Sequence, residues 1–546
     1  MIDGVYMGLV KSFSYKEEFL DNIKRYKYGV NWPVVYIIRN DKEAYIGEST
    51  RVYNRSLEHL KNKERVKLDT IDIVTDEDFN KSVISDLEAL LIEYMSADGK
   101  YIIQNGNAGL RKHNYYEREK YIKKFDSIWS ELKENDIVVR GLFEIRNSDL
   151  FKYSPYKSLT NEQYEVVESI VNNIVKNEKS NSIIQGEPGT GKTIVAIYLL
   201  KYLIEMKETR NLKVGLVVPM TSLRATLKKV FKAIKGLKAS MVLGPSDVVG
   251  NDYDILIVDE AHRLNRRVNI TNMKSFDDCN KKLGLNKEND QLDWIRLSCK
   301  HMILCYDKNQ SIKPADVRAE KFEEIDFKRY RITSQMRVLA GEDYIRYIEN
   351  ILNETQEDVI SFGEYELLIF DDLDKMHKAI IDKDEKYGLC RMIAGYAWDW
   401  KTKKNPEDYD IIIGDKKLRW NSKNTDWINS DNAINEVGCI HTTQGYDINY
   451  AGVILGNEIV YRNNRIEVLK DKYYDKNGKR TVTNEEELKK YILNIYKTIL
   501  TRGVRGTYLY ICDEELRQYF KKYIDVAISD IQGLEKDIIE NENLNV

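Results

Sequence analysis

The sequence predicts a multidomain α/β protein built on parallel sheets. The first sign is an apolar run at 182–184 that passes through a glycine-rich turn into an apolar stretch at 194–200. The second is an apolar run at 255–258 that ends in two adjacent carboxylates. The third is a set of short apolar runs in the second half of the chain, including 411–414 and 451–456. Continuous apolar runs that alternate with helical patterns are typical of strands buried on both faces of a parallel sheet.

Length and composition limit the classes of protein that fit. The chain has 546 residues, which suggests about three to four domains. Its net charge is −3, so any nucleic-acid contact must come from local basic faces. The six cysteines form no Cys-x-x-Cys pair, which argues against a disulfide framework or a zinc site and favours a reducing compartment. The N-terminus lacks a signal-peptide pattern and no apolar run is long enough to cross a bilayer, so we expect a cytoplasmic protein without membrane contact.

The glycine-rich turn has the spacing of a phosphate-binding loop. It consists of Gly186, Glu187, Pro188, Gly189, Thr190, Gly191, Lys192 and Thr193. Glycines allow successive backbone N–H groups to point at an anion, and the following helix adds the partial positive charge of its N-terminus. Lys192 would reach the β- and γ-phosphates, and the Thr193 hydroxyl would ligate Mg²⁺. The sequence therefore predicts an ATP or GTP site, and a chance glycine-rich turn is the weaker alternative.

The two carboxylates that end the apolar run at 255–258 are Asp259 and Glu260. In a nucleotide hydrolase, the first carboxylate at this place holds Mg²⁺ through water and the second polarises the attacking water. Together with the phosphate loop, the pair predicts hydrolysis as well as binding of the nucleotide.

A Thr-x-x-Gln pair, Thr160 and Gln163, precedes the helix expected at 164–175. It resembles the adenine-sensing motif of helicases. A glutamine amide can donate to N7 of adenine and accept from its N6 amino group, which would select ATP over GTP. Taken alone, the stretch is better explained as the capped start of an ordinary helix.

Two stretches after the carboxylate pair resemble further helicase motifs. Residues 301–310 form an apolar strand that ends near Gln310, which by this resemblance senses the γ-phosphate and couples it to bound nucleic acid. Residues 334–337 end in Arg337, which by the same resemblance is an arginine finger. A basic helix at 222–238 would meet a nucleic-acid backbone or, equally, form a solvated surface.

Two more motifs follow in the second half. The stretch 441–447 contains Gln444 and Gly445 and resembles helicase motif V. The stretch 498–507 resembles motif VI, in which an arginine reaches the γ-phosphate. We expect Arg502 to contact the γ-phosphate, with Arg505 as the alternative.

The order of these motifs resembles that of superfamily 1 helicases. The sequence around residues 394–398 and 500–507 is similar to sequences of the bacterial Schlafen-like DNA/RNA helicase family. The resemblance implies two RecA-like lobes with ATP in the cleft between them and nucleic acid across both. Lobe 1 would span 158–330, lobe 2 with its insertions 331–513, and a helical tail 514–546.

The N-terminal third predicts a separate small α/β domain. A strand hairpin at 34–47 is followed by helices at 53–63 and 86–94 and by a strand at 101–103. These elements carry Tyr36, Tyr45, Arg55, His59, Glu88 and Asn105. Over residues 33–110, they resemble the GIY-YIG endonucleases in order and approximate spacing, except that Val34 replaces a glycine. Residues 1–32 carry little pattern, and 111–157 would be a helical connector whose basic, tyrosine-containing run at 111–124 is a nucleic-acid face or a solvated helix.

The GIY-YIG resemblance implies a role for each residue. Glu88 would hold one divalent metal, Mg²⁺ with Mn²⁺ as the alternative, and Tyr36 would take a proton from water. Arg55 would bind the scissile phosphate, while Tyr45 and His59 would supply further hydrogen bonds and Asn105 would hold the fold together. The alternative is a degenerate nuclease fold kept for binding, with Tyr36 and Tyr45 as core tyrosines.

We therefore expect an ATP-dependent DNA helicase or translocase fused to a metal-dependent endonuclease, acting in restriction of foreign DNA such as phage defence. Alternatives are a nucleotide-gated sensor without strand separation, a repair or recombination enzyme, and an RNA-directed enzyme. The expected partners are DNA, with RNA as the alternative, and either a second copy of the chain or a partner protein of a defence system.

Overall fold

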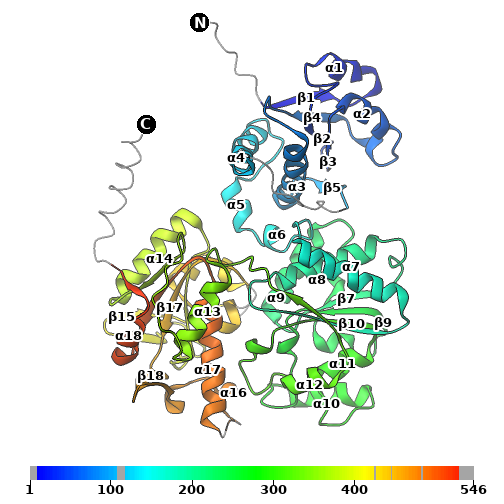
Figure 1. Cartoon of the computed structure of the whole chain (residues 1–546). Helices are drawn as coiled ribbons and strands as arrows, with labels where there is room; N and C mark the ends of the chain where they lie inside the picture. The colour runs from blue at the N-terminus through cyan, green and yellow to red at the C-terminus, as the bar shows by residue number, and fades with distance from the viewer. Residues whose placement is uncertain are drawn as a thin grey trace, which may run out of the picture. The chain divides into compact units, whose positions relative to one another are not determined.

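The computed structural model describes residues 9–106, 117–423, 426–443, 446–480, 482 and 484–527. The chain forms two compact units (Figure 1). The first contains Met1–Arg266, Asn272–Asp307 and Val317–Ser334. The second contains Arg267–Thr271, Lys308–Asp316 and Gln335–Val546. The chain thus passes from one unit to the other several times before it remains in the second.

The first unit begins with a five-stranded sheet in the order β1-β4-β2-β3-β5. Its strands are β1 (Val10–Ser14), β2 (Val34–Arg39), β3 (Glu43–Ser49), β4 (Thr70–Val74) and β5 (Ile102–Ile103). The hairpin expected from the sequence is β2 with β3, and β5 joins β3 in parallel. The sheet extends further toward the N-terminus than residue 33, because β1 pairs antiparallel with β4.

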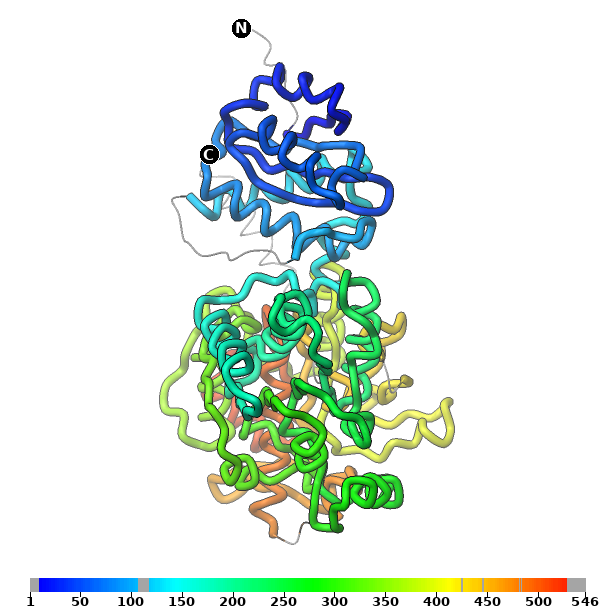
Figure 2. The backbone as a smooth tube through the Cα atoms, turned by 90° about the vertical axis from the view of Figure 1, so that its right-hand side faces the viewer, coloured from blue at the N-terminus to red at the C-terminus, as the bar shows by residue number. Residues whose placement is uncertain are grey.

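Helices cover both faces of this sheet, as the alternation of side chains along β2 requires. On one face Val35 and Ile37 join a core with α3 (Lys81–Asp98). On the other, Tyr36 and Ile38 pack with α1 (Leu20–Arg25) and α2 (Val52–Leu60). The backbone of these layers is drawn in blue in Figure 2.

The expected connector at 111–157 is packed into the core. It contains α4 (Arg118–Glu134), α5 (Leu142–Asn147) and α6 (Asp149–Lys152). Phe125 and Trp129 of α4 belong to the same buried cluster as α3. The Glu131 carboxylate accepts hydrogen bonds from the backbone N–H groups of Leu9 and Val10 at 2.8 and 2.9 Å, so α4 also fixes the start of β1. Residues 111–116 of the basic run lie outside the described residues.

The rest of the first unit is a six-stranded, all-parallel sheet in the order β11-β6-β10-β9-β7-β8. Its strands are β6 (Ser180–Gly186), β7 (Val214–Val217), β8 (Val242–Leu243), β9 (Tyr253–Val258), β10 (Cys299–Tyr306) and β11 (Lys328–Ile332). Its helices include α7 (Asn161–Lys176), α8 (Lys192–Glu205), α9 (Thr221–Ala233), α10 (Met273–Lys282), α11 (Gln291–Leu297) and α12 (Ala319–Glu324). The phosphate loop and the carboxylate pair leave the same, carboxyl-terminal edge of this sheet, where ligands of open α/β sheets bind.

The second unit contains another six-stranded, all-parallel sheet, in the order β16-β13-β17-β20-β12-β21. Its strands are β12 (Glu366–Ile369), β13 (Arg391–Ala394), β16 (Val437–Cys439), β17 (Ile448–Leu455), β20 (Gly503–Ile511) and β21 (Asp525–Val526). Helices α13 (Gly341–Leu352), α14 (Leu373–Tyr387), α17 (Glu485–Leu500) and α18 (Glu514–Phe520) belong to the same unit. Both parallel sheets were expected from the sequence.

Two details of the second unit differ from expectation. The run at 411–414 contributes β14 (Ile411–Ile413), which pairs antiparallel with β15 (Lys416–Leu418) outside the parallel sheet. The tail expected as a helix at 514–546 contains α18 but then contributes β21 to the sheet beside β12. Residues 528–546 lie outside the described residues.

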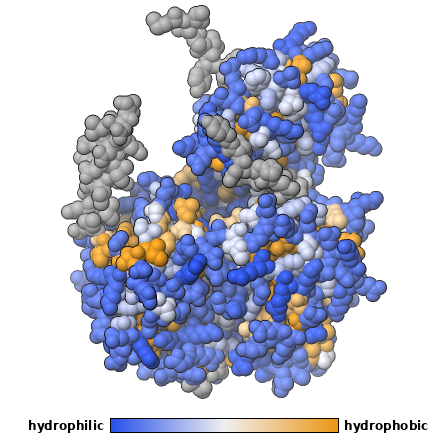
Figure 3. Space-filling model, viewed as in Figure 1, coloured by the Kyte–Doolittle hydropathy of each residue, from blue (hydrophilic) through white to orange (hydrophobic). Residues whose placement is uncertain are grey.

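Hydrophilic side chains predominate on the face drawn in Figure 3. Within the described part of the chain, no helix has the length and hydropathy that a bilayer crossing needs.

Glu458 is buried in the second unit beside Tyr496, whose hydroxyl donates to Oε1 at 2.6 Å. Its Oε2 is also buried and has no hydrogen-bond partner among the described residues. Burial raises the pKa of Glu458 to about 7, and the hydrogen bond from Tyr496 opposes this shift only in part. The carboxyl is therefore neutral in the folded unit at pH values where it ionises in the unfolded chain.

The raised pKa of Glu458 predicts a pH-dependent stability. A carboxyl group whose pKa is higher in the folded than in the unfolded state stabilises the fold fully at pH values below its unfolded-state pKa. This contribution to the free energy of unfolding is lost as the pH rises through the folded-state pKa. We expect the free energy of unfolding of the second unit to fall by about 2 kcal/mol between about pH 5 and pH 8 from this group alone. Calorimetry should show a shallower pH slope in Glu458→Gln and an unchanged slope in the exposed control Glu357→Gln. Equal slopes in wild type and Glu458→Gln would contradict the assignment.

Candidate functional site

The phosphate loop connects β6 to α8 with the backbone conformation that its glycines allow. Gly189 and Gly191 have φ angles of 85° and 79°, in the left-handed region that favours glycine. The Lys192 ammonium donates to the carbonyl oxygens of Gly186 and Glu187 at 2.6 and 2.8 Å. The cation therefore lies in the concave side of the loop, where a phosphate would be bound.

A hydroxyl and a carboxylate meet beside the loop. The Thr193 hydroxyl donates to Oδ2 of Asp259 at 2.9 Å, across the strand β10 that separates β6 from β9. Burial, together with the charge of Glu260, raises the pKa of Asp259 above its ordinary value. Hard oxygen ligands of this kind are those that Mg²⁺ prefers, so Thr193 and Asp259 fit the metal that the motifs imply.

Glu260 has a strained backbone and a basic neighbourhood. Its φ of 51° lies in the left-handed region, which is uncommon for a residue other than glycine and costs on the order of 1–3 kcal/mol. Oε2 of Glu260 lies 2.9 Å from Nε2 of His262. Burial alone would raise the pKa of Glu260, but His262, with Lys192 and Arg263, lowers it below the ordinary value. Glu260 is thus held as a carboxylate, the form that can polarise water.

Gln163 starts α7 inside a capping box. Its carbonyl accepts from the Thr160 backbone N–H at 3.0 Å, and the Thr160 hydroxyl accepts from the Gln163 N–H at 3.2 Å. Its amide group donates to the carbonyl of Thr190 in the phosphate loop at 2.9 Å. Both groups that would read adenine are therefore engaged within the protein, and Gln163 links the loop to α7.

The remaining helicase-motif residues belong to the second unit. Arg337 forms an ion pair with Asp447. Arg502 Nη1 donates to the carbonyl of Tyr446 at 3.2 Å, and the Arg505 guanidinium lies 4.8 Å from the ring centroid of Tyr387. Gln310 is buried at the end of a short helix. Gln444 and Gly445 lie outside the described residues.

The small N-terminal sheet brings a second group of polar residues together. Tyr36 and Gly47 are paired across β2 and β3. A Cβ atom on Gly47 would lie 2.3 Å from the Tyr36 hydroxyl oxygen, so only glycine lets the phenol ring lie over β3. The Tyr36 hydroxyl lies 2.8 Å from Nε2 of His59 on α2.

The glycine contact gives a direct prediction. Gly47→Ala should displace Tyr36, lower the stability of the N-terminal sheet by about 1–3 kcal/mol, and abolish any activity that depends on the Tyr36 hydroxyl. Gly141→Ala is the matched control, because its Cβ would come no closer than 3.8 Å to another side chain. Thermal unfolding monitored by fluorescence measures both variants, and a Gly47→Ala protein as stable as the control would contradict the packing argument.

Aromatic and basic groups surround Tyr36. The ring of His59 lies 5.0 Å from that of Tyr45, and the Arg65 guanidinium lies 3.7 Å from the Tyr45 ring centroid. Arg55 on α2 donates to Glu58 at 2.5 Å, and its positive charge also acts on Tyr36. Burial raises the pKa of Tyr36 well above its usual range, and Arg55 acts in the opposite direction.

Glu88 extends toward the same group from α3. Burial and the nearby charge of Glu48 raise the pKa of Glu88 to about 7, while Arg55 and the Glu48 backbone N–H lower it. The side chains that the sequence singled out come from two strands and two helices and are Tyr36, Tyr45, Arg55, His59 and Glu88. Tyr36, Tyr45 and His59 are in contact with one another, and the charge of Arg55 acts on both Tyr36 and Glu88. A carboxylate, a phenol and an arginine in one place can hold a metal, move a proton and bind a phosphate.

Asn105 has a structural role beside this group. Its carbonyl accepts from the Ile46 N–H at 3.0 Å and its amide donates to the Ile46 carbonyl at 2.8 Å. The side chain thereby extends the pairing of the β3 edge and holds the strand that carries Tyr45 and Gly47.

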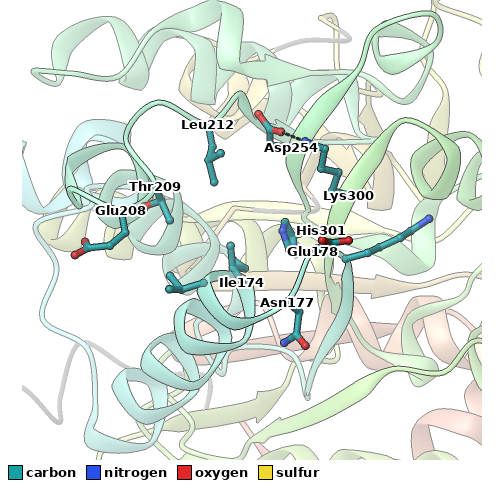
Figure 4. A pocket seen from close by; sticks show the side chains of 11 residues that line it. Ile174, Asn177, Glu178, Glu208, Thr209, Leu212, Asp254, Lys300 and His301 are labelled. Atoms are coloured by element: carbon teal, nitrogen blue, oxygen red, sulfur yellow. Dashed lines mark hydrogen bonds and ion pairs between the residues drawn. The ribbon is translucent and has the colours of Figure 1, made fainter.

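A cavity of about 630 Å³ lies elsewhere in the first unit (Figure 4). Lys300 and His301 at the start of β10, Asp254 near the start of β9 and Leu212 just before β7 line it, so it lies at the amino-terminal edge of the large sheet. Asp254 and Lys300 pair there at 2.8 Å. None of the residues expected to bind nucleotide or metal lines this cavity.

Several residues of these sites were not singled out from the sequence, and three of them contact the central groups directly or act on them through their charge. These three are Glu48, Arg65 and His262. His262 could have been found from the sequence, since it lies just after Asp259 and Glu260. Glu48 and Arg65 reach their partners through tertiary packing, and neither stands in a pattern of its own.

This chain is similar to a protein of yeast and to a solved helicase structure. The uncharacterized protein YPL245W of Saccharomyces cerevisiae is 31% identical over 388 residues, which are 62% of this chain and 82% of the yeast protein. A solved structure concerned with DNA unwinding at forked double-stranded DNA by two coordinating Pif1 helicases matches 71% of this chain and 98% of its own, at 13% identity and a TM-score of 0.27.

A family model gives the stronger result. The model described as Schlafen group 3, DNA/RNA helicase domain matches residues 179–513, more than half of the chain. The match includes the phosphate loop, the carboxylate pair and the motifs of the second unit, while the N-terminal sheet precedes it. The chain therefore belongs to the Schlafen group 3 DNA/RNA helicase domain family, and is an ATP-hydrolysing enzyme that acts on nucleic acid.

Proposed function

We propose that this chain is an ATP-driven DNA helicase or translocase whose N-terminal sheet is a divalent-metal-dependent endonuclease of GIY-YIG type. The observation that carries the nuclease proposal is the contact of Tyr36 with His59 and Tyr45, together with Arg55 and Glu88, whose charges act on Tyr36. A hydrogen bond of 2.8 Å joins Tyr36 to His59, and the charge of Arg55 acts on the pKa of both Tyr36 and Glu88, which supports the proposal.

Each residue of the N-terminal group has a defined part in the proposed hydrolysis. Glu88 would hold Mg²⁺ or Mn²⁺, which supplies positive charge to the phosphate under attack. Arg55 would bind the scissile phosphate with its guanidinium. Tyr36 would accept the proton of the attacking water once its hydroxyl is ionised, a form that the positive charge of Arg55 favours.

The nucleotide site would work through residues of the parallel-sheet units. Lys192 would bind the β- and γ-phosphates, Thr193 and Asp259 would hold Mg²⁺, and Glu260 would orient water. Further assignments are Gln310, Gln444 and Gly445 for coupling to nucleic acid, and Arg337 with Arg502, or Arg505 in its place, for the γ-phosphate. Gln163 would read adenine only if its side chain leaves Thr160 and Thr190 when the nucleotide binds.

The combination of motor and nuclease favours restriction of foreign DNA, including phage defence, as the biological role. In that role the chain would act with a second copy of itself or with a partner protein of a defence system. This part of the proposal rests on architecture, since one fold serves many functions.

Cleavage and unwinding assays on the purified full chain test the proposal. We expect metal-dependent cuts in defined linear and forked DNA, ATP turnover that nucleic acid stimulates, and strand displacement that needs ATP. ATP turnover without any strand displacement would show that the chain is a nucleotide-gated sensor and not a helicase. Stronger stimulation by RNA than by DNA would change the substrate, and no cleavage with either Mg²⁺ or Mn²⁺ would refute the nuclease.

A further inference from the structure

We propose that Arg65 is a positioning residue that holds His59 in the tautomer protonated at Nε2, so that His59 donates a hydrogen bond to Tyr36. The role in catalysis rests on the proposed nuclease function, but the tautomer itself follows from the hydrogen bonds. No motif includes Arg65, which lies at the start of a short helix at Arg65–Lys67.

The geometry allows only one direction for the first hydrogen bond. Nη1 of Arg65 lies 2.5 Å from Nδ1 of His59. A guanidinium has donors and no acceptor, so Nδ1 must present its lone pair. A neutral imidazole carries one ring proton, and that proton is therefore on Nε2.

The second hydrogen bond then follows from the first. Nε2 of His59 lies 2.8 Å from the Tyr36 hydroxyl oxygen, and with its proton it must be the donor. Doubly protonated His59 would direct an N–H group at the Arg65 donor. Burial, with Arg65 and Arg55, lowers the pKa of His59 to about 3, in agreement with a neutral ring.

Arg65 is itself held in place by stacking. Its guanidinium lies 3.7 Å from the ring centroid of Tyr45, and the Tyr45 ring in turn lies 5.0 Å from His59. Stacking on an aromatic face fixes the plane of a guanidinium in a way that a lysine ammonium does not reproduce. The donor is therefore fixed in direction, which is what selection of one tautomer requires.

The tautomer matters for the chemistry at Tyr36. With His59 as a donor, the Tyr36 oxygen receives a hydrogen bond from His59, which favours the ionised phenol over the neutral one, and the positive charge of Arg55 acts in the same direction. In the opposite tautomer, His59 would accept the Tyr36 proton in a hydrogen bond and would favour the neutral phenol. The ionised form is the one that can accept a proton from water, so Arg65 acts on cleavage through His59.

Nitrogen NMR of the full chain tests this directly. The six histidines are labelled with the NMR-active nitrogen isotope, and His59 is identified by the signal lost in His59→Gln. The variants compared are Arg65→Met, Arg65→Lys and the exposed neighbour Lys67→Met as control. We expect wild type and control to show a protonated Nε2 and an unprotonated Nδ1, and Arg65→Met to show a mixture or the opposite tautomer.

Cleavage kinetics give the second readout. For Arg65→Met we expect kcat to fall at least about tenfold with KM for DNA little changed, while ATP turnover reports that the chain is folded. A protonated Nδ1 in wild type would overturn the proposal, as would loss of cleavage in Arg65→Met with an unchanged tautomer. If wild type cuts no DNA, the nuclease function fails while the NMR result still decides whether Arg65 sets the tautomer.

Discussion

Replacement of Lys192 by alanine is expected to lower ATP turnover by at least about a hundredfold while the chain stays folded. The Lys192 ammonium lies in the phosphate loop and donates to the carbonyls of Gly186 and Glu187. Alanine removes the cation that would neutralise the β- and γ-phosphates, and no other lysine lies in the loop. Phosphate release in the presence of nucleic acid is the measurement.

The control for Lys192→Ala is Lys207→Ala, which removes an exposed lysine just after α8 in the same unit. We expect its turnover to equal that of wild type. Wild-type turnover in Lys192→Ala would show that the nucleotide is bound elsewhere. Matching circular dichroism and melting curves exclude unfolding as the cause of a loss.

Replacement of Glu88 by glutamine is expected to lower metal-dependent DNA cleavage at least about a hundredfold and to leave ATP turnover within about twofold of wild type. Glutamine keeps the size of the side chain but removes the charge that would bind Mg²⁺ or Mn²⁺. The separation of the two effects follows from position, because Glu88 lies on α3 of the small sheet and Lys192 at the edge of the large one.

The control for Glu88→Gln is the exposed Glu119→Gln on α4. Metal titrations of both variants should show weaker binding only in Glu88→Gln. If cleavage persists in Glu88→Gln, the metal is bound elsewhere and the role assigned to the N-terminal group is wrong.

The nucleotide site could be located from the sequence because its parts are local. The loop from Gly186 to Thr193 is continuous, and its strand and helix are adjacent in the chain. The same holds for Asp259 and Glu260 after β9. The parallel sheets followed from continuous apolar runs, whose burial on both faces requires helices on either side.

The rest depends on pairings between distant segments. β1 has a polar pattern of its own and becomes a strand because β4, some sixty residues later, supplies its hydrogen bonds. A run of three isoleucines at 411–413 does not show the direction of its partner, so its place in an antiparallel hairpin was not predicted. Arg65 stands in no pattern, and only folding brings it against Tyr45 and His59.

The repeated passage of the chain between the two units constrains how the protein is made and dissected. The stretch Lys308–Asp316 belongs to the second unit, where Ile312 is part of the hydrophobic core and the Ser311 carbonyl accepts from Asn494 at 2.9 Å. A fragment beginning at residue 335 would therefore contain a hole in its interior and an amide without its acceptor. During synthesis on the ribosome, this short segment cannot pair with Asn494 until nearly two hundred further residues have been made. A recombinant C-terminal half is expected to be insoluble unless the missing peptide is supplied in trans.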